Sequence, residues 1–320
     1  MAQFHEASWT PFKYDGGIYA VPTIQDFPMM YYRTDILNKL GLEVPETWDE
    51  LYDVLRELQR NKFSIGIKEA DSATAGVTSA LGIFDMMMFQ KGGRYYNEDL
   101  TQVNFESMEG KEAFVDLVKL YRDYGLDRDF DVLTRFRSGE MPIIIGGTAT
   151  YQSFAAIATE IQGRWAMTTV PGTVKEDGTV DHTAVSTANG AIILKAAKER
   201  GVADEAFEFV KWWADAKTQE KYAYAMESIQ GIAGRPTLAN LVAFENVGWT
   251  DEEKAILNKQ RSYVRGIEQI PGNYIVLRHF TNALRTSIDD YEDPLRQLNI
   301  QCRFINEELI RKRAEFVDNN

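Results

Sequence analysis

Segments with helical periodicity alternate along this sequence with short apolar segments typical of strands, and this alternation constrains the fold most. Strand-type segments occur at 27–32, 63–67, 141–147, 165–170 and 183–194. Helical patterns lie between or after them, at 47–58, 78–90, 107–121, 203–215 and 218–227. Interleaving of this kind predicts an α/β fold.

Local signals mark a turn and two helix starts. Asp15-Gly16-Gly17 supplies the positive-φ residues that a tight β-hairpin needs. Thr47-Trp-Asp-Glu50 has the pattern of a capping box, in which a hydroxyl and a carboxylate bind free backbone N–H groups. The acidic segment 250–253 is expected to cap a further helix.

The last helical segment carries an apolar stripe at 3-4-3-4 spacing: Leu295, Leu298, Cys302, Ile305 and Leu309. The stripe fits either a coiled-coil seam or a terminal helix packed on a core. Two heptads are too few for the seam, so we expect the packed helix. Cys302 is then a buried structural thiol, and as the only cysteine it forms no internal disulfide.

Length and charge exclude several classes of protein. The 320 residues suffice for about two domains. Against 35 basic residues stand 48 acidic ones, a net charge of −13, which argues against a nucleic-acid partner or an anionic membrane surface. No window reaches the roughly 18 apolar residues of a membrane span, and residues 1–30 show no secretory signal. A cytoplasmic protein and a chain without its export segment both fit.

Motifs for catalysis or cofactor binding are missing from the sequence. It has no phosphate-binding loop, no dinucleotide fingerprint, no His-Glu-x-x-His and no Gly-x-Ser-x-Gly. Only three histidines occur, without ligand-like spacing. We therefore expect no cofactor and no metal, although 48 acidic residues leave a carboxylate pair for glycan cleavage open as an alternative.

Aromatic residues are abundant, at 12% of the chain, and several stand beside glycine, proline or amides. An aromatic plane beside amides and carboxylates is how a cleft binds a sugar. Tyr151 and Tyr274, which we expect in loops, are the best candidates for such contacts. Trp212 and Trp213 lie on an amphipathic helix and are expected to pack in the core.

Five motifs occur in order between residues 10 and 236. They are Tyr14-Asp-Gly-Gly-Ile-Tyr-Ala-Val-Pro-Thr-Ile-Gln-Asp-Phe27, Met30-Tyr-Tyr-Arg-Thr-Asp-Ile-Leu37, Gly41-Leu-Glu-Val-Pro-Glu-Thr-Trp-Asp-Glu50, Phe89-Gln-Lys-Gly-Gly93 with Tyr96-Asn-Glu-Asp99, and Phe136-Arg-Ser-Gly-Glu-Met-Pro-Ile-Ile-Ile-Gly-Gly147. This series resembles the extracellular solute-binding proteins of ABC importers, in the sugar-binding branch that includes maltose-binding protein.

The resemblance implies a two-lobed periplasmic-binding-protein (type II) fold that closes on its ligand through hinge strands. It implies that residues 1–19 are a remnant of the amino-terminal lobe and 20–186 form the carboxy-terminal lobe. Residues 187–265 would then belong to the amino-terminal lobe, and 266–320 would be helices packed on the carboxy-terminal lobe.

The resemblance also implies ligand-contacting positions in the cleft. They are Gln25 and Asp26 after the first interlobe crossing, Glu69 in the loop after 63–67, Tyr151 in the loop after Gly146-Gly147, Asn189 at the second crossing, Arg235 in the Gly231–Pro236 loop, and Tyr274 near a family aromatic position. The protein would be a non-catalytic monomer that binds a sugar or oligosaccharide and delivers it to an ABC permease.

The sequence departs from the family pattern at its start and at two aromatic positions. It lacks the first strand-helix-strand-helix portion of the amino-terminal lobe, so we expect a longer chain whose missing segment carries an export signal or lipid anchor. Neither 71–76 nor Gly146–Thr150 has the tryptophan of many sugar binders, which leaves the ligand class open. A sensing or interaction module of a longer surface protein and a glycan-active enzyme are the alternatives.

Overall fold

The computed structural model describes residues 2–69 and 80–318 and confirms the α/β class. The run 71–76 and residues 78–79 of the expected helix 78–90 lie outside the described residues. The other expected strands and helices are present within a few residues of their predicted bounds. Among the described helices, none has both the length and the apolar character to cross a membrane.

A four-stranded sheet of order β5-β6-β4-β7 carries apolar side chains on both faces. Its strands are β4 (Met29–Arg33), β5 (Ile65–Gly66), β6 (Ile143–Gly146) and β7 (Trp165–Thr168). Strand β4 runs antiparallel to β6 and β7, and β5 runs parallel to β6. Because successive strand residues point to opposite faces, Met30 and Ile145 join one hydrophobic core while Tyr31 and Ile144 join the other.

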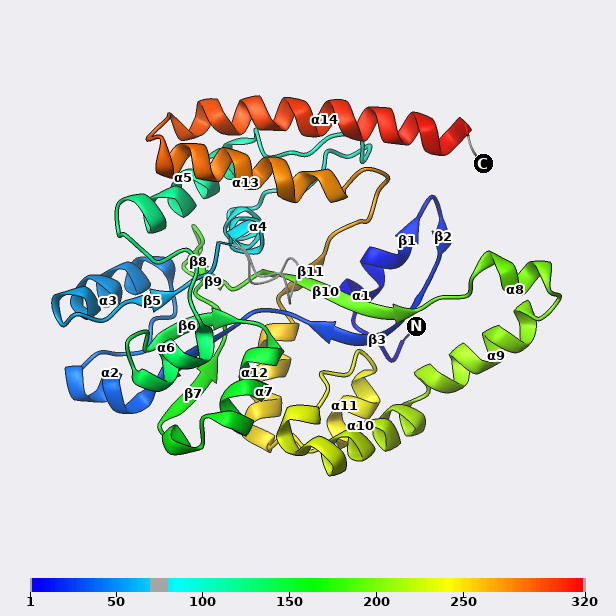
Figure 1. The fold of residues 1–320 in the computed structure, drawn as a ribbon, viewed down its shortest axis with the longest axis horizontal. Helices are drawn as coiled ribbons and strands as arrows, with labels where there is room; N and C mark the ends of the chain where they lie inside the picture. The colour runs from blue at the N-terminus through cyan, green and yellow to red at the C-terminus, as the bar shows by residue number, and fades with distance from the viewer. Residues whose placement is uncertain (1, 70–79, 319–320) are drawn as a thin grey trace.

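A second sheet, of order β11-β10-β3, crosses the middle of the molecule (Figure 1). Its strands are β3 (Val21–Asp26), β10 (Ala184–Ala191) and β11 (Val264–Gly266). Strand β10 runs antiparallel to β3, with Thr187 opposite Asp26, and parallel to β11. A Cβ at Gly190 would lie 2.8 Å from the Phe12 ring, so only glycine lets that ring pack on the strand.

A helical layer covers the upper side of the crossing sheet in Figure 1. It consists of α4 (Ala80–Gln90), α5 (Met108–Arg122), α13 (Tyr274–Asp289) and α14 (Pro294–Asp318). Phe84 of α4 packs against Phe105 and Phe280, with ring centroids 4.8 and 4.9 Å apart. Cys302 is fully buried with the rest of its stripe from Leu298 on, which confirms a terminal helix packed on the core.

The remaining elements surround these two sheets. Below the crossing sheet in Figure 1 lie α7 (Thr148–Ile157), α10 (Ala216–Gln230), η3 (Gly231–Gly234), α11 (Leu241–Asn246) and α12 (Asp251–Arg261). At the left lie α2 (Thr34–Leu40), α3 (Trp48–Arg60) and α6 (Val132–Ser138), and at the right α8 (Lys195–Glu199) and α9 (Ala203–Ala214). The shorter elements are α1 (Glu6–Trp9), η1 (Thr10–Phe12), β1 (Lys13–Tyr14), β2 (Gly17–Ile18), η2 (Thr159–Ile161), β8 (Thr173–Val174) and β9 (Val180–Asp181).

The expected turn and capping signals are confirmed. Strands β1 and β2 pair as a hairpin, with φ values of 46° at Asp15 and 73° at Gly16. Thr47 and Thr250 each form a complete capping box, at the starts of α3 and α12. Each of these features depends on residues within a few positions of one another, so it can be recognised in the sequence.

Helix α9 differs from its prediction. Trp212, which we expected to pack in the core, is 55% exposed, and Phe209 beside it is 61% exposed. Val210 and Ala214 form the buried side of the helix. The exposed apolar side chains of the segment just after β10 and of α9, namely Ile192, Leu194, Phe207, Phe209 and Trp212, are called the apolar face below.

Candidate functional site

A cavity of about 530 Å³ lies on the crossing strand β10, beneath the first turn of α13. A volume of this size suits a small organic solute. Its lining residues are Pro11 and Phe12 of η1, Leu81 and Asp85 of α4, Tyr95, Val185–Ala188 of β10, Ile267, Gln269, Asn273, and Tyr274, Val276 and Leu277 of α13. Contact with the crossing strand distinguishes it from a cavity of about 490 Å³ between the β1–β2 hairpin and α14.

Asp85 is the acidic residue of the cavity. It lies four residues after Leu81, so both side chains share the face of α4 that lines the cavity. Asp85 is 3% exposed, and its Oδ1 has no hydrogen-bond partner within the described part of the chain. Burial raises the pKa of this carboxyl well above its usual range, because an apolar environment disfavours the charged form.

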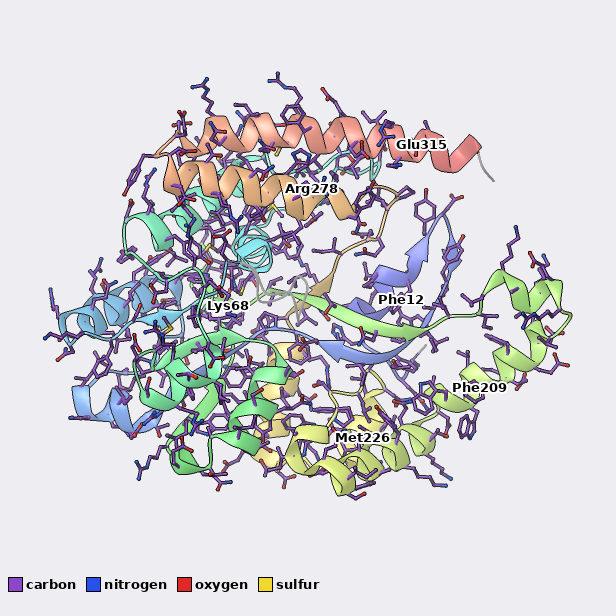
Figure 2. The ribbon with its side chains drawn as sticks, in the orientation of Figure 1. Phe12, Lys68, Phe209, Met226, Arg278 and Glu315 are labelled. Atoms are coloured by element: carbon purple, nitrogen blue, oxygen red, sulfur yellow. The ribbon has the colours of Figure 1, made fainter. Side chains whose placement is uncertain are left out.

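Three aromatic residues, Phe12, Tyr95 and Tyr274, line the cavity. Phe12 lies beside β10 (Figure 2), and Tyr274 begins α13 and is 63% exposed. Tyr95 is held in place by Tyr96 and Phe105, whose ring centroids are 4.7 and 5.0 Å away. Rings fixed in this way offer apolar planes on which a flat ligand face can stack.

Polar side chains from β10 and from the segment before α13 complete the cavity. The Ser186 hydroxyl accepts a hydrogen bond of 3.0 Å from the Gln25 amide, which lies behind it on β3. Asn273 donates to the Gln269 side chain at the entrance to α13. Hydroxyl and amide groups at fixed positions give such a cavity the means to orient a polar ligand.

Asp26, a predicted contact, interacts with the start of α7. Its Oδ1 accepts hydrogen bonds of 2.9 Å from both the backbone N–H and the hydroxyl of Thr148. Burial raises the pKa of Asp26, while these hydrogen bonds oppose the rise. This cap lets the helix begin at Thr148, so the expected placement of Tyr151 in a loop is wrong: it lies within α7.

The Glu253 carboxylate contacts two predicted ligand-binding residues, Tyr151 and Arg235. The Tyr151 hydroxyl donates to Glu253, and Arg235 Nη1 lies 3.8 Å from the other oxygen of Glu253. Arg235 also pairs with Glu227 and places its guanidinium 5.3 Å from the Trp249 ring. Both residues are buried, and burial together with the Glu253 contact raises the pKa of Tyr151.

Glu69 lies in an ion-pair cluster at the edge of the helical layer. It pairs with Arg285 of α13 and lies 3.5 Å from Arg128, which also pairs with Asp289 at 2.9 Å. Glu69 is buried, whereas the Arg285 side chain is largely exposed. The cluster connects the segment after β5 to α13.

Among the three remaining predicted residues, only Tyr274 lines the cavity, while Gln25 contacts the lining residue Ser186. Asn189 is an exposed residue of β10 at the register shift, and its carbonyl accepts a hydrogen bond from Thr23. Gln25 is fully buried behind Ser186. Tyr274 lines the cavity, although it lies in the first turn of α13 rather than in the loop we expected. The structure therefore connects two of the predicted residues, Tyr274 and Gln25, to this cavity.

Sequence reasoning missed Asp85, and a signal for it existed. It is the single charged residue in the segment 80–90, which is otherwise apolar apart from Gln90. A lone carboxylate in a helix expected to be buried on all sides is costly, and such residues gather at functional sites.

Solved structures similar to this chain include sugar-binding proteins of low sequence identity. An ABC transporter solute-binding protein from Thermotoga lettingae, bound with α-D-tagatose, is 18% identical with a TM-score of 0.73 over 96% of this chain and 76% of its own. The sugar-binding protein MalE of Xanthomonas citri is 16% identical with a TM-score of 0.74, over 98% and 76%. A cyclic α-maltosyl-1,6-maltose binding protein from Arthrobacter globiformis is 17% identical with a TM-score of 0.74, over 97% and 77%. At these identities the likeness shows the two-lobed fold.

The family is shown by the sequence itself. A model of the family described as bacterial extracellular solute-binding protein matches residues 2–252, which is most of the chain. Its members bind solutes outside the cytoplasm and are not enzymes. This chain belongs to the bacterial extracellular solute-binding proteins.

Proposed function

We propose that the protein binds a carbohydrate in the cavity on β10. The observation that carries this proposal is the combination of aromatic planes and fixed polar groups around one cavity of suitable volume. Phe12, Tyr95 and Tyr274 offer stacking faces, while Ser186 and Gln269 offer hydroxyl and amide groups. The sugars named for proteins with the same fold support a carbohydrate over other solutes.

The bound carbohydrate is delivered to the permease of an ABC importer. This role is supported by the solute-binding family and by the ABC transporter named for one protein with the same fold. The protein works as a monomer outside the cytoplasm, anchored to the membrane through a lipid or signal segment. The alternatives from the sequence, a sensing module and a glycan-active enzyme, have no feature of the site in their favour.

The two lobes close on the ligand by bending at β3 and β10. The proposed division assigns 1–19 and 187–265 to the amino-terminal lobe, and 20–186 with the helices of 266–320 to the other. Its support is that β3 and β10 pair with each other and cross the middle of the molecule (Figure 1). Strands that pass between lobes can bend through small φ/ψ changes while each core stays packed.

Among the residues predicted from the resemblance, we assign Tyr274 to ligand stacking and Gln25 to positioning the Ser186 hydroxyl. The assignment follows from the lining of the cavity and from the Gln25–Ser186 hydrogen bond. Asp26, Glu69, Tyr151, Asn189 and Arg235 remain predictions, since their polar groups have partners within the chain or lie apart from this cavity.

A thermal-shift screen with neutral and charged mono- and oligosaccharides tests the proposal. A ligand at a hundredfold excess over its Kd stabilises the folded state by about 2.7 kcal/mol, so at least one sugar should raise the melting temperature. Tyr274→Ala should weaken the binding of that sugar by about 0.5–1.5 kcal/mol through loss of stacking. Tyr224→Ala, which truncates a comparably exposed tyrosine on α10, is the matched control and should leave the affinity unchanged. A flat screen, or equal losses in both variants, contradicts the proposal.

A further inference from the structure

The buried helix α4 contains two polar residues, Gln90 and Asp85, which differ in their hydrogen bonding. The Gln90 amide accepts from the Trp48 indole at 2.8 Å and the Thr173 hydroxyl at 3.1 Å, and it donates to the carbonyls of Pro171 and Thr183. Asp85 is as deeply buried, yet its Oδ1 has no partner within the described part of the chain. The helix is therefore able to satisfy a buried polar side chain fully, and at Asp85 it does not.

An unpartnered carboxyl in this position weakens the fold. A buried carboxylate is strongly destabilising unless it is paired, and a leucine or methionine would suit the surrounding core. Proteins depart from local packing rules mainly where function requires it. Asp85 faces the cavity together with Leu81, so the missing partner belongs to whatever occupies the cavity.

The surroundings of Asp85 favour a cation as that partner. The described lining residues include no lysine or arginine, so nothing there balances the carboxylate. The rings of Phe12, Tyr95 and Tyr274 line the same space, and aromatic faces attract an ammonium group through their negative electrostatic potential. A carboxylate surrounded by aromatic rings suits a ligand that carries an amine better than one with hydroxyls alone.

We infer that the cavity takes an aminated sugar, and that Asp85 binds its ammonium group while the aromatic rings hold the sugar ring. The inference rests on the proposed function, because it specifies the kind of carbohydrate that the same cavity binds. The Ser186 hydroxyl accepts from Gln25 and still has its own hydrogen to donate to a hydroxyl group of the sugar.

Calorimetric titration with matched ligands tests the inference. Glucosamine and galactosamine are compared with glucose, galactose and N-acetylglucosamine, which keep the ring but lack the charge. An amino sugar should bind at least about tenfold more tightly than its neutral counterparts, equivalent to about 1.4 kcal/mol. In Asp85→Asn the preference should disappear, because the neutral amide cannot pair with an ammonium group, while the neutral sugars keep their affinities.

Glu268→Gln is the matched control, since it removes an acidic side chain that lies next in sequence to Ile267 and Gln269 but does not line the cavity. It should retain the preference for amino sugars. Equal or tighter binding of neutral sugars by the unaltered protein overturns the inference and leaves the proposed function standing, and this comparison does not depend on any variant. A preference that survives in Asp85→Asn also overturns it. Binding of no sugar of either kind overturns the proposed function as well.

Discussion

At the scale of single residues, the surroundings of Asp85 predict how stability depends on pH. Burial raises its pKa in the folded state, so folding favours the protonated form. The stability this gives is fully present below the unfolded pKa of about 3.9 and is lost as pH rises toward the folded pKa. Asp85→Asn should therefore melt at a higher temperature than the unaltered protein at about pH 7, and the gap should shrink toward about pH 4. Calorimetric melts over this range measure the gap.

Asp181 is the matched control because its carboxylate has partners. Burial of this carboxyl is outweighed by hydrogen bonds from Lys175 at 2.7 Å and from the Thr183 backbone at 2.8 Å, so its pKa is lowered. A lowered pKa gives stability that is present at neutral pH and lost as pH falls through the folded value. Asp181→Asn should melt lower at neutral pH and approach the unaltered protein in acid. The same sign for both variants would contradict the role of burial at Asp85.

At the scale of elements, the start of a helix can be predicted from the sequence when its capping residues are local, but not when the cap comes from a distant residue. The capping boxes of α3 and α12 use residues three positions apart, and both are confirmed. The cap of α7 comes from Asp26, 122 positions away from Thr148, so no local pattern announces it. Tyr151 was consequently expected in a loop and lies in a helix. The prediction that Trp212 packs in the core was wrong for a different reason. The amphipathic pattern of α9 is local, but it does not tell which neighbouring element covers each apolar side chain, and Trp212 is exposed.

The α3 cap gives a prediction at this scale. The Thr47 hydroxyl accepts the Glu50 backbone N–H at 3.2 Å, and the Glu50 carboxylate accepts the Thr47 N–H at 3.1 Å. Thr47→Ala should reduce the free energy of unfolding by about 1 kcal/mol, measured by denaturant titration. Thr47→Ser keeps the hydroxyl and should lose much less. Equal losses in the two variants would mean that packing of the threonine methyl group, rather than the cap, stabilises the helix start.

At the scale of the whole molecule, the sequence was sufficient for the architecture but not for the site. The alternation of helical and strand patterns predicts α/β organisation, since each pattern depends on local periodicity. The cavity combines side chains from η1, α4, β10 and α13, which are separated by up to 266 positions between Pro11 and Leu277. No spacing rule connects these segments, so only Tyr274 among its lining residues was foreseen. Asp85 illustrates why the site could not be predicted, because its role is indicated by the lack of a hydrogen-bond partner for Oδ1 among the described residues and not by its neighbours in sequence.

The apolar face combines exposed side chains from the segment after β10 and from α9, which lie at one end of the fold (Figure 1, and Phe209 in Figure 2). Contiguous exposed apolar side chains bind hydrophobic probes and partners. The chain of residues 1–320 should therefore enhance the fluorescence of an apolar dye in its native state. The double variant Phe209→Ser with Trp212→Gln should reduce this signal while its melting temperature changes little, since exposed positions contribute within about 0.5 kcal/mol.

Val210 lies on the same helix between these two residues and supplies the control. It is 6% exposed and belongs to the buried side of α9, so Val210→Ser should lower the melting temperature and leave the native dye signal unchanged or higher. The two variants thus separate exposed apolar area from packing on a single helix. If the double variant destabilises the fold as strongly as Val210→Ser, the side chains of Phe209 and Trp212 are packed in solution and the apolar face is not exposed there.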